Sequence, residues 1–164
     1  GNSLSKNIDS YQEAFDLLFK SVVHTTSLVI PNMQKNKWGR IINVTSVSVK
    51  EPLNYLVLSN SIRSAVVAWG KSLSVDIGKD GITINSILTG YFDTERIKEL
   101  NKEKSKSLNI SEDEVLEKMK SLVPANRLGN IDEYGYLVSF LSSDKAAYIN
   151  GASIPIDGGL LKSY

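Results

Sequence analysis

Apolar residues in the first part of the chain recur at intervals of three and four, which predicts a long amphipathic helix over residues 11–36. Ser10 and Glu13 have the spacing of a capping box, in which a serine and a glutamate satisfy two free backbone donors of the first helical turn. Pro31 and the polar run 34–37 mark the expected end of this helix. Its stripe consists of Phe15, Leu18, Val22, Thr25 and Val29, with Phe19 and Leu28 beside it.

A second amphipathic helix is predicted from about residue 56 to residue 77, after a turn around Glu51-Pro52. Small side chains on this segment suit close packing against another helix. The apolar stripe includes Ile62, Val66, Trp69, Leu73 and Ile77, and the small residues are Ser61, Ser64, Ala65 and Ala68.

Three short segments rich in β-branched residues, at 40–46, 82–88 and 153–157, are typical of buried parallel strands. They alternate with the helical segments, and this order predicts an α/β layer with a parallel sheet. Three strands are few, and a strand buried on both faces needs a neighbour or a cover at each edge. The pattern therefore indicates a sheet that has been cut.

The composition turns charged between residues 93 and 120, where Ser111 and Glu114 form a second predicted capping box. Residues 91–125 are a candidate substrate lid over a strand's carboxyl end, and a solvated helical hairpin is the alternative. A further capping box, Asn130 with Glu133, opens a helix that runs to about residue 142.

Composition narrows the class of protein. The 164 residues are 41% hydrophobic, enough for one core, so a single domain over 1–164 is expected. The net charge is +1, and acids and bases are interspersed, which argues against a nucleic-acid partner. No cysteine is present, and the one histidine, His24, is expected to be an ordinary helix residue, so no metal site is predicted. No apolar run approaches the ~18 residues of a membrane span, and a cytoplasmic protein without a membrane partner is expected.

The order of landmarks from Asp9 to Gly159 resembles the later part of the short-chain dehydrogenase/reductase family. The strand at 39–46 is similar to the strand that delivers the family's catalytic serine. Residues 71–85 resemble the end of the next helix and the strand after it. The segment 88–94 is similar to the Pro-Gly…Thr segment that lies against the nicotinamide, and 148–159 to the closing Thr-Gly…Asp-Gly-Gly. The resemblance implies a Rossmann-like fold and places this chain near 3-oxoacyl-acyl-carrier-protein reductases.

The family's Gly-rich turn, which binds the cofactor pyrophosphate at a helix amino end, has no counterpart in the sequence. The resemblance begins about where the family's fourth strand ends, and Gly1-Asn2-Ser3 is a candidate remnant of the Asn-Ala-Gly-like turn there. The strand at 41–45 is then expected to border a missing strand. A separate amino-terminal piece is the partner that this reading implies.

The resemblance assigns the site position by position. Ser46 stands where the family's serine stands, and the Tyr-x-x-x-Lys pair falls on Ser59 and Arg63, thirteen residues after Ser46 as the family pattern expects. The relay asparagine of the family falls on Leu18. A serine is a weaker acid than a tyrosine and is shorter, whereas arginine keeps the charge of lysine with a different geometry. Tyr55, about one helical turn before Ser59, is an alternative catalyst, and packing at the helix start is its ordinary role.

The resemblance also implies cofactor contacts at Gly90, Thr94 and Arg63. Each has a structural alternative: Gly90 as a turn glycine, Thr94 as a helix cap, and Ser46 as a strand-end hydroxyl that bonds to backbone. NAD and NADP stay equally open, because the residues that read the ribose 2′ position belong to the part without a counterpart.

Three functions follow. The first is an NAD(P)-dependent oxidoreductase that transfers hydride between nicotinamide and a small carbonyl or alcohol, with a divergent site. The second is an inactive family member that acts as a binding or assembly protein, which the loss of the tyrosine, lysine and asparagine favours. The third is another reaction in the same cleft, such as dehydration or isomerisation. The resemblance implies a homo-oligomer, a dimer or tetramer, in which the helices at 11–36 and 56–77 pair with symmetry mates and the last strand with Gly158-Gly159 forms the other contact.

Overall fold

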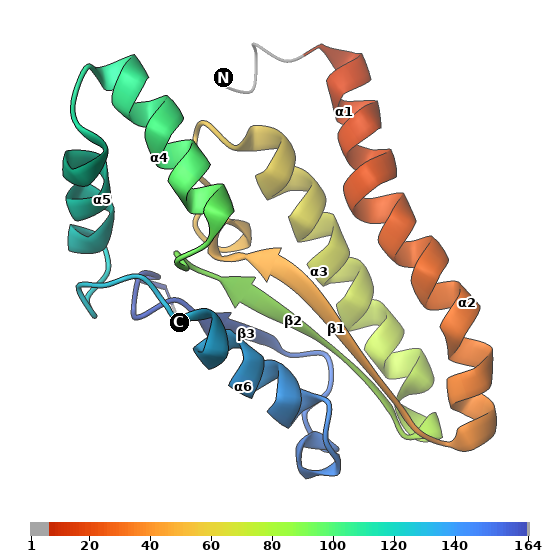
Figure 1. Ribbon diagram of the computed structural model, residues 1–164. Coiled ribbons are helices and arrows are strands. Elements are labelled where there is room, and N and C mark those ends of the chain that lie inside the picture. The colour runs from red at the N-terminus through yellow and green to blue at the C-terminus, as the bar shows by residue number, and fades with distance from the viewer. Residues whose placement is uncertain (1–6, 164) are drawn as a thin grey trace.

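The chain forms a three-stranded parallel sheet with helices on both faces (Figure 1). The computed structural model describes residues 7–163, so the segment Gly1-Asn2-Ser3, which was compared with a family turn, lies outside the described residues. The strands are β1 (Gly39–Ser46), β2 (Ile82–Thr89) and β3 (Ser153–Ile156), and β2 lies in the middle. The helices are α1 (Ile8–Phe15), α2 (Ser21–Asn36), α3 (Val57–Ile77), α4 (Glu95–Leu108), α5 (Glu112–Ser121) and α6 (Ile131–Leu141). The α/β fold with a parallel sheet is confirmed.

The first predicted helix is one long rod, in which a π-helical segment, Asp16–Lys20, joins α1 to α2. The prediction of a capping box at Ser10 and Glu13 is wrong. The helix begins earlier, at Ile8, because the side chain of Asn7 accepts a hydrogen bond from the Ser10 backbone N–H at 2.9 Å and caps the first turn.

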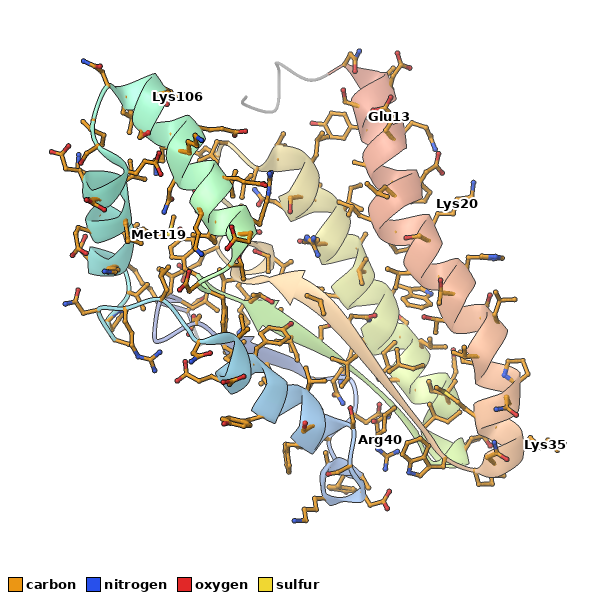
Figure 2. The ribbon with its side chains drawn as sticks, in the orientation of Figure 1. Glu13, Lys20, Lys35, Arg40, Lys106 and Met119 are labelled. Carbon is orange, nitrogen blue, oxygen red and sulfur yellow. The ribbon has the colours of Figure 1, made fainter. Side chains whose placement is uncertain are left out.

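Pro31 does not end this helix but lies inside α2, which continues to Asn36. Lys37 then adopts the left-handed conformation (φ 50°) that closes the helix. The last turn is held from outside, because Gln34 and Lys37 both bind the carboxylate of the buried residue Asp80, at 2.8 and 2.5 Å. Lys20 and Lys35 point away from the sheet on the outer side of the rod (Figure 2).

Each face of the sheet carries its own hydrophobic cluster. On one face, Ile77 of α3 packs with Ile82 and Ile84 of β2, and side chains of α2 complete the cluster. On the other face, Leu141 of α6 packs with Ile87 of β2. Every residue of β2 from Ile82 to Leu88 is buried, including the polar residues Thr83, Asn85 and Ser86, as expected for a central parallel strand covered on both faces.

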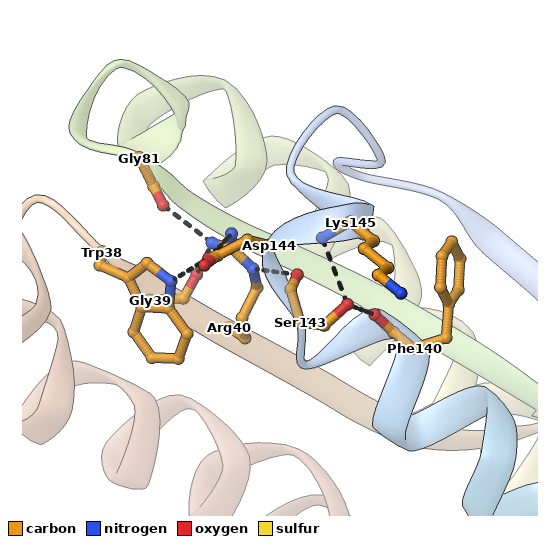
Figure 3. Close-up of polar contacts among 8 residues, drawn as sticks. All are labelled: Trp38, Gly39, Arg40, Gly81, Phe140, Ser143, Asp144 and Lys145. Carbon is orange, nitrogen blue, oxygen red and sulfur yellow. Dashed lines mark hydrogen bonds and ion pairs between the residues drawn. The ribbon is translucent and has the colours of Figure 1, made fainter.

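The amino ends of the strands are fastened by Arg40, whose side chain is only 5% exposed (Figure 3). Its guanidinium donates to the carbonyl oxygens of Gly81 at 3.0 Å and Ser143 at 3.3 Å, and so joins β1 to the start of β2 and to the turn after α6. The ring of Trp38 lies against the guanidinium at 5.0 Å, and the Trp38 indole N–H donates to Asp144 at 2.8 Å. This contact network lies at the end of the sheet opposite to the predicted site.

The charged segment forms two helices, α4 and α5, that project from the carboxyl end of β2 (Figure 1). The capping boxes of Ser111 with Glu114, at the start of α5, and of Asn130 with Glu133, at the start of α6, are both confirmed. Within residues 7–163, β1 pairs with β2 alone, and its Val44 side chain is 58% exposed. No helix in this part of the chain is long and apolar enough to cross a bilayer.

Candidate active site

Ser46 ends β1 at the carboxyl edge of the sheet, level with Thr89 at the end of β2. Its hydroxyl oxygen accepts a hydrogen bond from the backbone N–H of Ser48 at 3.1 Å and caps the short 3₁₀ turn Val47–Val49. The structural alternative foreseen for this serine is therefore present. A hydroxyl that accepts one bond still has its own proton to donate, so Ser46 remains able to bond a substrate oxygen.

Ser59 and Arg63 lie one turn apart on α3 and contact each other. The Arg63 Nε donates to the Ser59 hydroxyl at 3.3 Å, and one terminal nitrogen donates to the carbonyl oxygen of Val44 at 2.8 Å. Arg63 thus bridges α3 and β1 two residues before Ser46. Of the three residues predicted to carry catalysis, the structure brings Ser59 and Arg63 into contact, and Arg63 reaches β1 two residues before Ser46.

Leu18, which stands at the position of the family's relay asparagine, has apolar side chains around it. Leu18 lines a cavity of about 250 Å³ between the amino-terminal rod and β1, together with Leu17 and Val22. Arg63 lines the same cavity from α3. The family's asparagine-mediated proton path therefore has no equivalent group at this position.

Gly90 and Thr94 each have a structural reason for their identity. A Cβ on Gly90 would lie 2.6 Å from the Cα of Asp157, because the backbone after β2 runs close to the backbone after β3. The Gly90 N–H also donates to Ile156 at 3.0 Å. Thr94 caps α4 by accepting from the backbone N–H of Ile97 at 3.4 Å. Contact of either residue with a nicotinamide stays a prediction.

Two tyrosines near this edge of the sheet were not foreseen. Tyr91 directly follows Gly90, and burial raises the pKa of its phenol, with a further rise from the neighbouring Tyr55. The Tyr134 hydroxyl lies 3.2 Å from that of Thr89. Burial raises the pKa of Tyr134 too, while the hydrogen bond to Thr89 and the charge of Arg63 act in the opposite direction. An aromatic residue directly after the strand-ending glycine was the signal that could have indicated Tyr91.

The base of the candidate lid is tied to α6 by an ion pair. Arg127 donates to both carboxylate oxygens of Glu133, at 2.6 and 2.8 Å. Together with the hydrogen bond that the backbone N–H of Asn130 donates to the same carboxylate, this ion pair lowers the pKa of Glu133 to about 2. Beside this pair, a cavity of about 850 Å³ opens between α4, α5 and the start of α6. Side chains of both charge signs line it, among them Lys98 and Asp113.

The donor set fits one end of a nicotinamide cofactor. The hydroxyls of Ser46 and Thr94 and the guanidinium of Arg63 are donors that suit a carboxamide and ribose hydroxyls. The sequence offers no Gly-rich turn for the pyrophosphate. Among residues 7–163, no group of three or more histidine, cysteine, aspartate and glutamate side chains could hold a metal ion.

Comparison with known proteins identifies the family. A family model described as enoyl-(acyl carrier protein) reductase matches residues 1–161. The chain is 32% identical to the NADPH-dependent reductase BacG of Bacillus subtilis over 131 residues, which are 80% of this chain and 51% of that protein. It is 33% identical to the 3-oxoacyl-[acyl-carrier-protein] reductase FabG of Haemophilus influenzae over 159 residues, 93% of this chain and 60% of that protein.

Solved structures agree with this assignment. The structure of YwfH, an NADPH-dependent reductase involved in bacilysin biosynthesis, has a TM-score of 0.94 at 26% identity and covers 99% of this chain and 63% of its own. L-sorbose reductase from Gluconobacter frateurii, in complex with NADPH and L-sorbose, has a TM-score of 0.92 at 25% identity over 99% of this chain and 62% of its own. The chain belongs to the short-chain dehydrogenase/reductase family of oxidoreductases. It spans about half to two thirds of the length of these relatives.

Proposed function

We propose that this chain supplies the substrate-binding and proton-handling half of an NAD(P)-dependent oxidoreductase that interconverts a small carbonyl compound and its alcohol. The observation that carries the proposal is the contact of Arg63 with Ser59 on α3 and the bond of Arg63 to the carbonyl oxygen of Val44, two residues before Ser46 on β1. Membership of the family supports the same reaction class. So do the relative BacG and the solved structure of YwfH, which are both described as NADPH-dependent reductases.

A nicotinamide cofactor, when bound, supplies or accepts the hydride. The residues of this chain then have three tasks. The Ser46 proton bonds the substrate oxygen and orients it, and the Arg63 charge favours negative charge as it develops on that oxygen. Ser59 leaves room where the family has a tyrosine, because its side chain is shorter. Carbonyl compounds of small size fit this arrangement, and α4 and α5 shape the entrance.

Two partners are part of the proposal. A separate or preceding amino-terminal piece would contribute the nucleotide-binding turn and a strand beside β1, and the exposed Val44 supports a neighbour at that edge. A homo-oligomer, dimer or tetramer, is supported by apolar side chains on the outer helices, such as Leu17 (72% exposed) and Leu28 (67% exposed). A cytoplasmic location stays a prediction, supported by the absence of cysteine from the sequence.

A binding or assembly protein without turnover is the second candidate. It is favoured by Ser59 in place of the tyrosine and by Leu18 in place of the asparagine. Under this reading Arg63 fastens α3 to β1 and has no further task.

The first measurement is the intact mass of the denatured protein from its natural source, which identifies any companion polypeptide. The native preparation is then supplied with NADH and with NADPH, each with a panel of ketones and aldehydes, and cofactor absorbance at 340 nm is followed. We expect turnover with one of the two cofactors. No turnover with any pair, together with specific assembly in light scattering, would favour the second candidate.

The Ser46→Ala variant tests the site itself. Loss of a donor to a developing oxyanion lowers turnover by about 10²–10³-fold, and we expect a fall in kcat/KM of this order. Ser72→Ala is the matched control, because Ser72 lies exposed on α3 and its hydroxyl donates only to its own helix, at Ala68. Since Ser46 also caps a turn, thermal unfolding of both variants is recorded. A fully active, folded Ser46→Ala protein would remove this serine from the site.

A further inference from the structure

The segment that follows β3, residues 157–163, runs along the carboxyl edge of the sheet, and we call it the strap. Its first part is a turn closed by Asp157, whose carboxylate accepts hydrogen bonds from the backbone N–H groups of Gly159 at 2.9 Å and Leu161 at 2.8 Å. Aspartate side chains commonly bond the backbone shortly after themselves and so shape a turn. The first part of the strap is therefore held by a residue of its own.

The last two residues of the strap are held by a distant carboxylate. The backbone N–H groups of Lys162 and Ser163 both donate to the Oε1 atom of Glu51, each at 2.8 Å. Glu51 lies in the loop after β1, 111 residues before Lys162. A carboxylate oxygen can accept two such bonds, and bonds to an ionised acceptor are stronger than bonds between neutral groups. The strap thereby joins β3 to the loop after β1, across the end of β2 that lies between them.

Glu51 is connected to Ser46 through a short turn. The Ser46 hydroxyl accepts a hydrogen bond from the backbone N–H of Ser48 at 3.1 Å and caps this 3₁₀ turn. The carbonyl oxygen of Val47 then accepts hydrogen bonds from the N–H groups of Lys50 at 3.0 Å and Glu51 at 3.2 Å. A displacement of Glu51 would therefore move the turn that Ser46 caps.

The other contacts of the strap lie at the candidate lid and at Gly90. The backbone N–H of Ala125, at the end of the candidate lid, donates to the carbonyl oxygen of Gly158 at 3.1 Å. Gly158 has a φ of 64°, and a Cβ there would lie 2.7 Å from a methyl group of Val123. A Cβ on Gly90 would lie 2.6 Å from the Cα of Asp157. The strap thus contacts three segments that the proposed function needs together, namely the loop after Ser46, the lid and the glycine predicted to contact nicotinamide.

We propose that Glu51 is a positioning residue of the active site, which fixes Ser46 relative to the lid by fastening the strap to the loop after β1. This inference rests on the proposed oxidoreductase function. Glu51 acts through the turn that Ser46 caps, and its contribution is an oxygen that accepts two backbone bonds. Glutamine keeps an oxygen of this kind, whereas alanine leaves the N–H groups of Lys162 and Ser163 without their acceptor.

The first test measures the strap itself and needs no cofactor. Amide hydrogen exchange is followed residue by residue by NMR in the wild-type protein and in Glu51→Ala. The amide protons of Lys162 and Ser163 should exchange about tenfold faster in the variant, since their shared acceptor is gone. The amide protons of Gly159 and Leu161, whose acceptor is unchanged, are the internal control. Equal exchange at Lys162 and Ser163 in the two proteins would overturn the inference.

The second test is steady-state turnover. Glu51→Ala should lower kcat by about 10–10²-fold with KM within a few-fold, because a small misplacement of a group that orients the substrate costs this much. Glu51→Gln should recover most of this loss, since its amide oxygen can accept the same two bonds. Asp76→Ala is the control and should leave kcat unchanged, because Asp76 is exposed near the end of α3 that lies away from Ser59.

Proline tests the same contact from the strap. Ser163→Pro removes one of the two N–H donors and Ser163→Ala keeps it, so only the proline variant should lower kcat. Added to Glu51→Ala, the proline should cause no further loss, because the bond that it removes is already absent. Ser163 is exposed, so this pair of variants also decides if Glu51→Ala fails to fold.

The outcomes separate this inference from the proposed function. Additive losses in the double variant, or a folded Glu51→Ala protein with the kcat of wild type, would overturn the positioning role and leave the proposed function standing. A wild-type protein that turns over no nicotinamide would overturn the proposed function, and the positioning role of Glu51 with it, whatever the exchange experiment shows.

Discussion

At the scale of the single residue, Gly90 illustrates how one position can satisfy a family pattern and a packing requirement together. Its resemblance to the family's Pro-Gly segment suggested a cofactor contact. The structure supplies a reason that needs no cofactor, since the backbone of Asp157 occupies the space of a Cβ. The two roles are compatible, but they predict different consequences of substitution.

Gly90→Ala should destabilise the protein by about 1–3 kcal/mol, because the added methyl overlaps a backbone that can yield only by separating the ends of β2 and β3. Urea unfolding measures the change. Gly135→Ala is the control, because nothing lies within 4 Å of a Cβ there and Gly135 is inside α6. That variant should gain about 0.5–1 kcal/mol. Equal unfolding midpoints for the two variants would contradict the close approach at Gly90.

Arg40 is a second residue whose side chain joins separate segments of the chain. Arg40→Lys should lower stability by about 1–3 kcal/mol, since an ammonium cannot serve the carbonyls of Gly81 and Ser143 and also lie flat against Trp38. Arg96→Lys, at an exposed ion pair with Glu99, is the matched substitution and should change stability by less than about 1 kcal/mol. Thermal unfolding of both variants measures these changes in stability. Similar losses of stability in the two variants would argue against the role of Arg40 in joining the strand ends.

At the scale of the element, the patterns predicted what depends on local sequence. The strands and α3 followed from β-branched runs and helical spacing, and two capping boxes were found because each lies within four residues. The box at Ser10 failed because Asn7, three residues earlier, competes for the same helix start. The contact of Arg40 with Ser143 was beyond prediction, because only the fold brings such distant residues together.

The base of the lid gives a pH-dependent expectation. Glu133 titrates at about 2 in the folded protein and near its ordinary value of 4.5 when unfolded, so its contribution to stability is complete above pH 4.5 and is lost as the pH falls toward 2. Glu133→Gln should therefore be less stable than wild type at pH 7, and the difference should shrink as the pH falls through this window. Urea midpoints at pH 7 and pH 3 measure it. A difference that is constant with pH would mean that the Arg127 pair does not stabilise α6.

At the scale of the whole molecule, the oligomer proposal concerns the exposed surface of the amino-terminal rod. Leu17 and Leu28 of this rod are largely exposed, and exposed apolar groups are typical of association surfaces. The family resemblance independently names this rod as an interface.

Leu17→Glu combined with Leu28→Glu should therefore weaken self-association at least about tenfold, since each buried charge without a partner costs more than the ~1.4 kcal/mol that a tenfold change represents. Sedimentation velocity over a concentration series measures the dissociation. Leu108→Glu, at an exposed leucine (52%) at the end of α4, is the control and should assemble as wild type does. An assembly unaffected by the double substitution would assign the contact to another surface, with the last strand next to be tested.

The open side of β1 bears on solubility. A strand edge with free N–H and C=O groups is a template on which a foreign strand can add, and natural proteins often protect such edges with charged side chains. The bond from Arg63 to the carbonyl oxygen of Val44 places a guanidinium on this strand, beside an exposed valine. The arginine that stands in for the family's lysine thereby occupies one acceptor of this strand and places a positive charge beside it. Lysine, with one donating centre, could not hold Ser59 and Val44 in the same forked way.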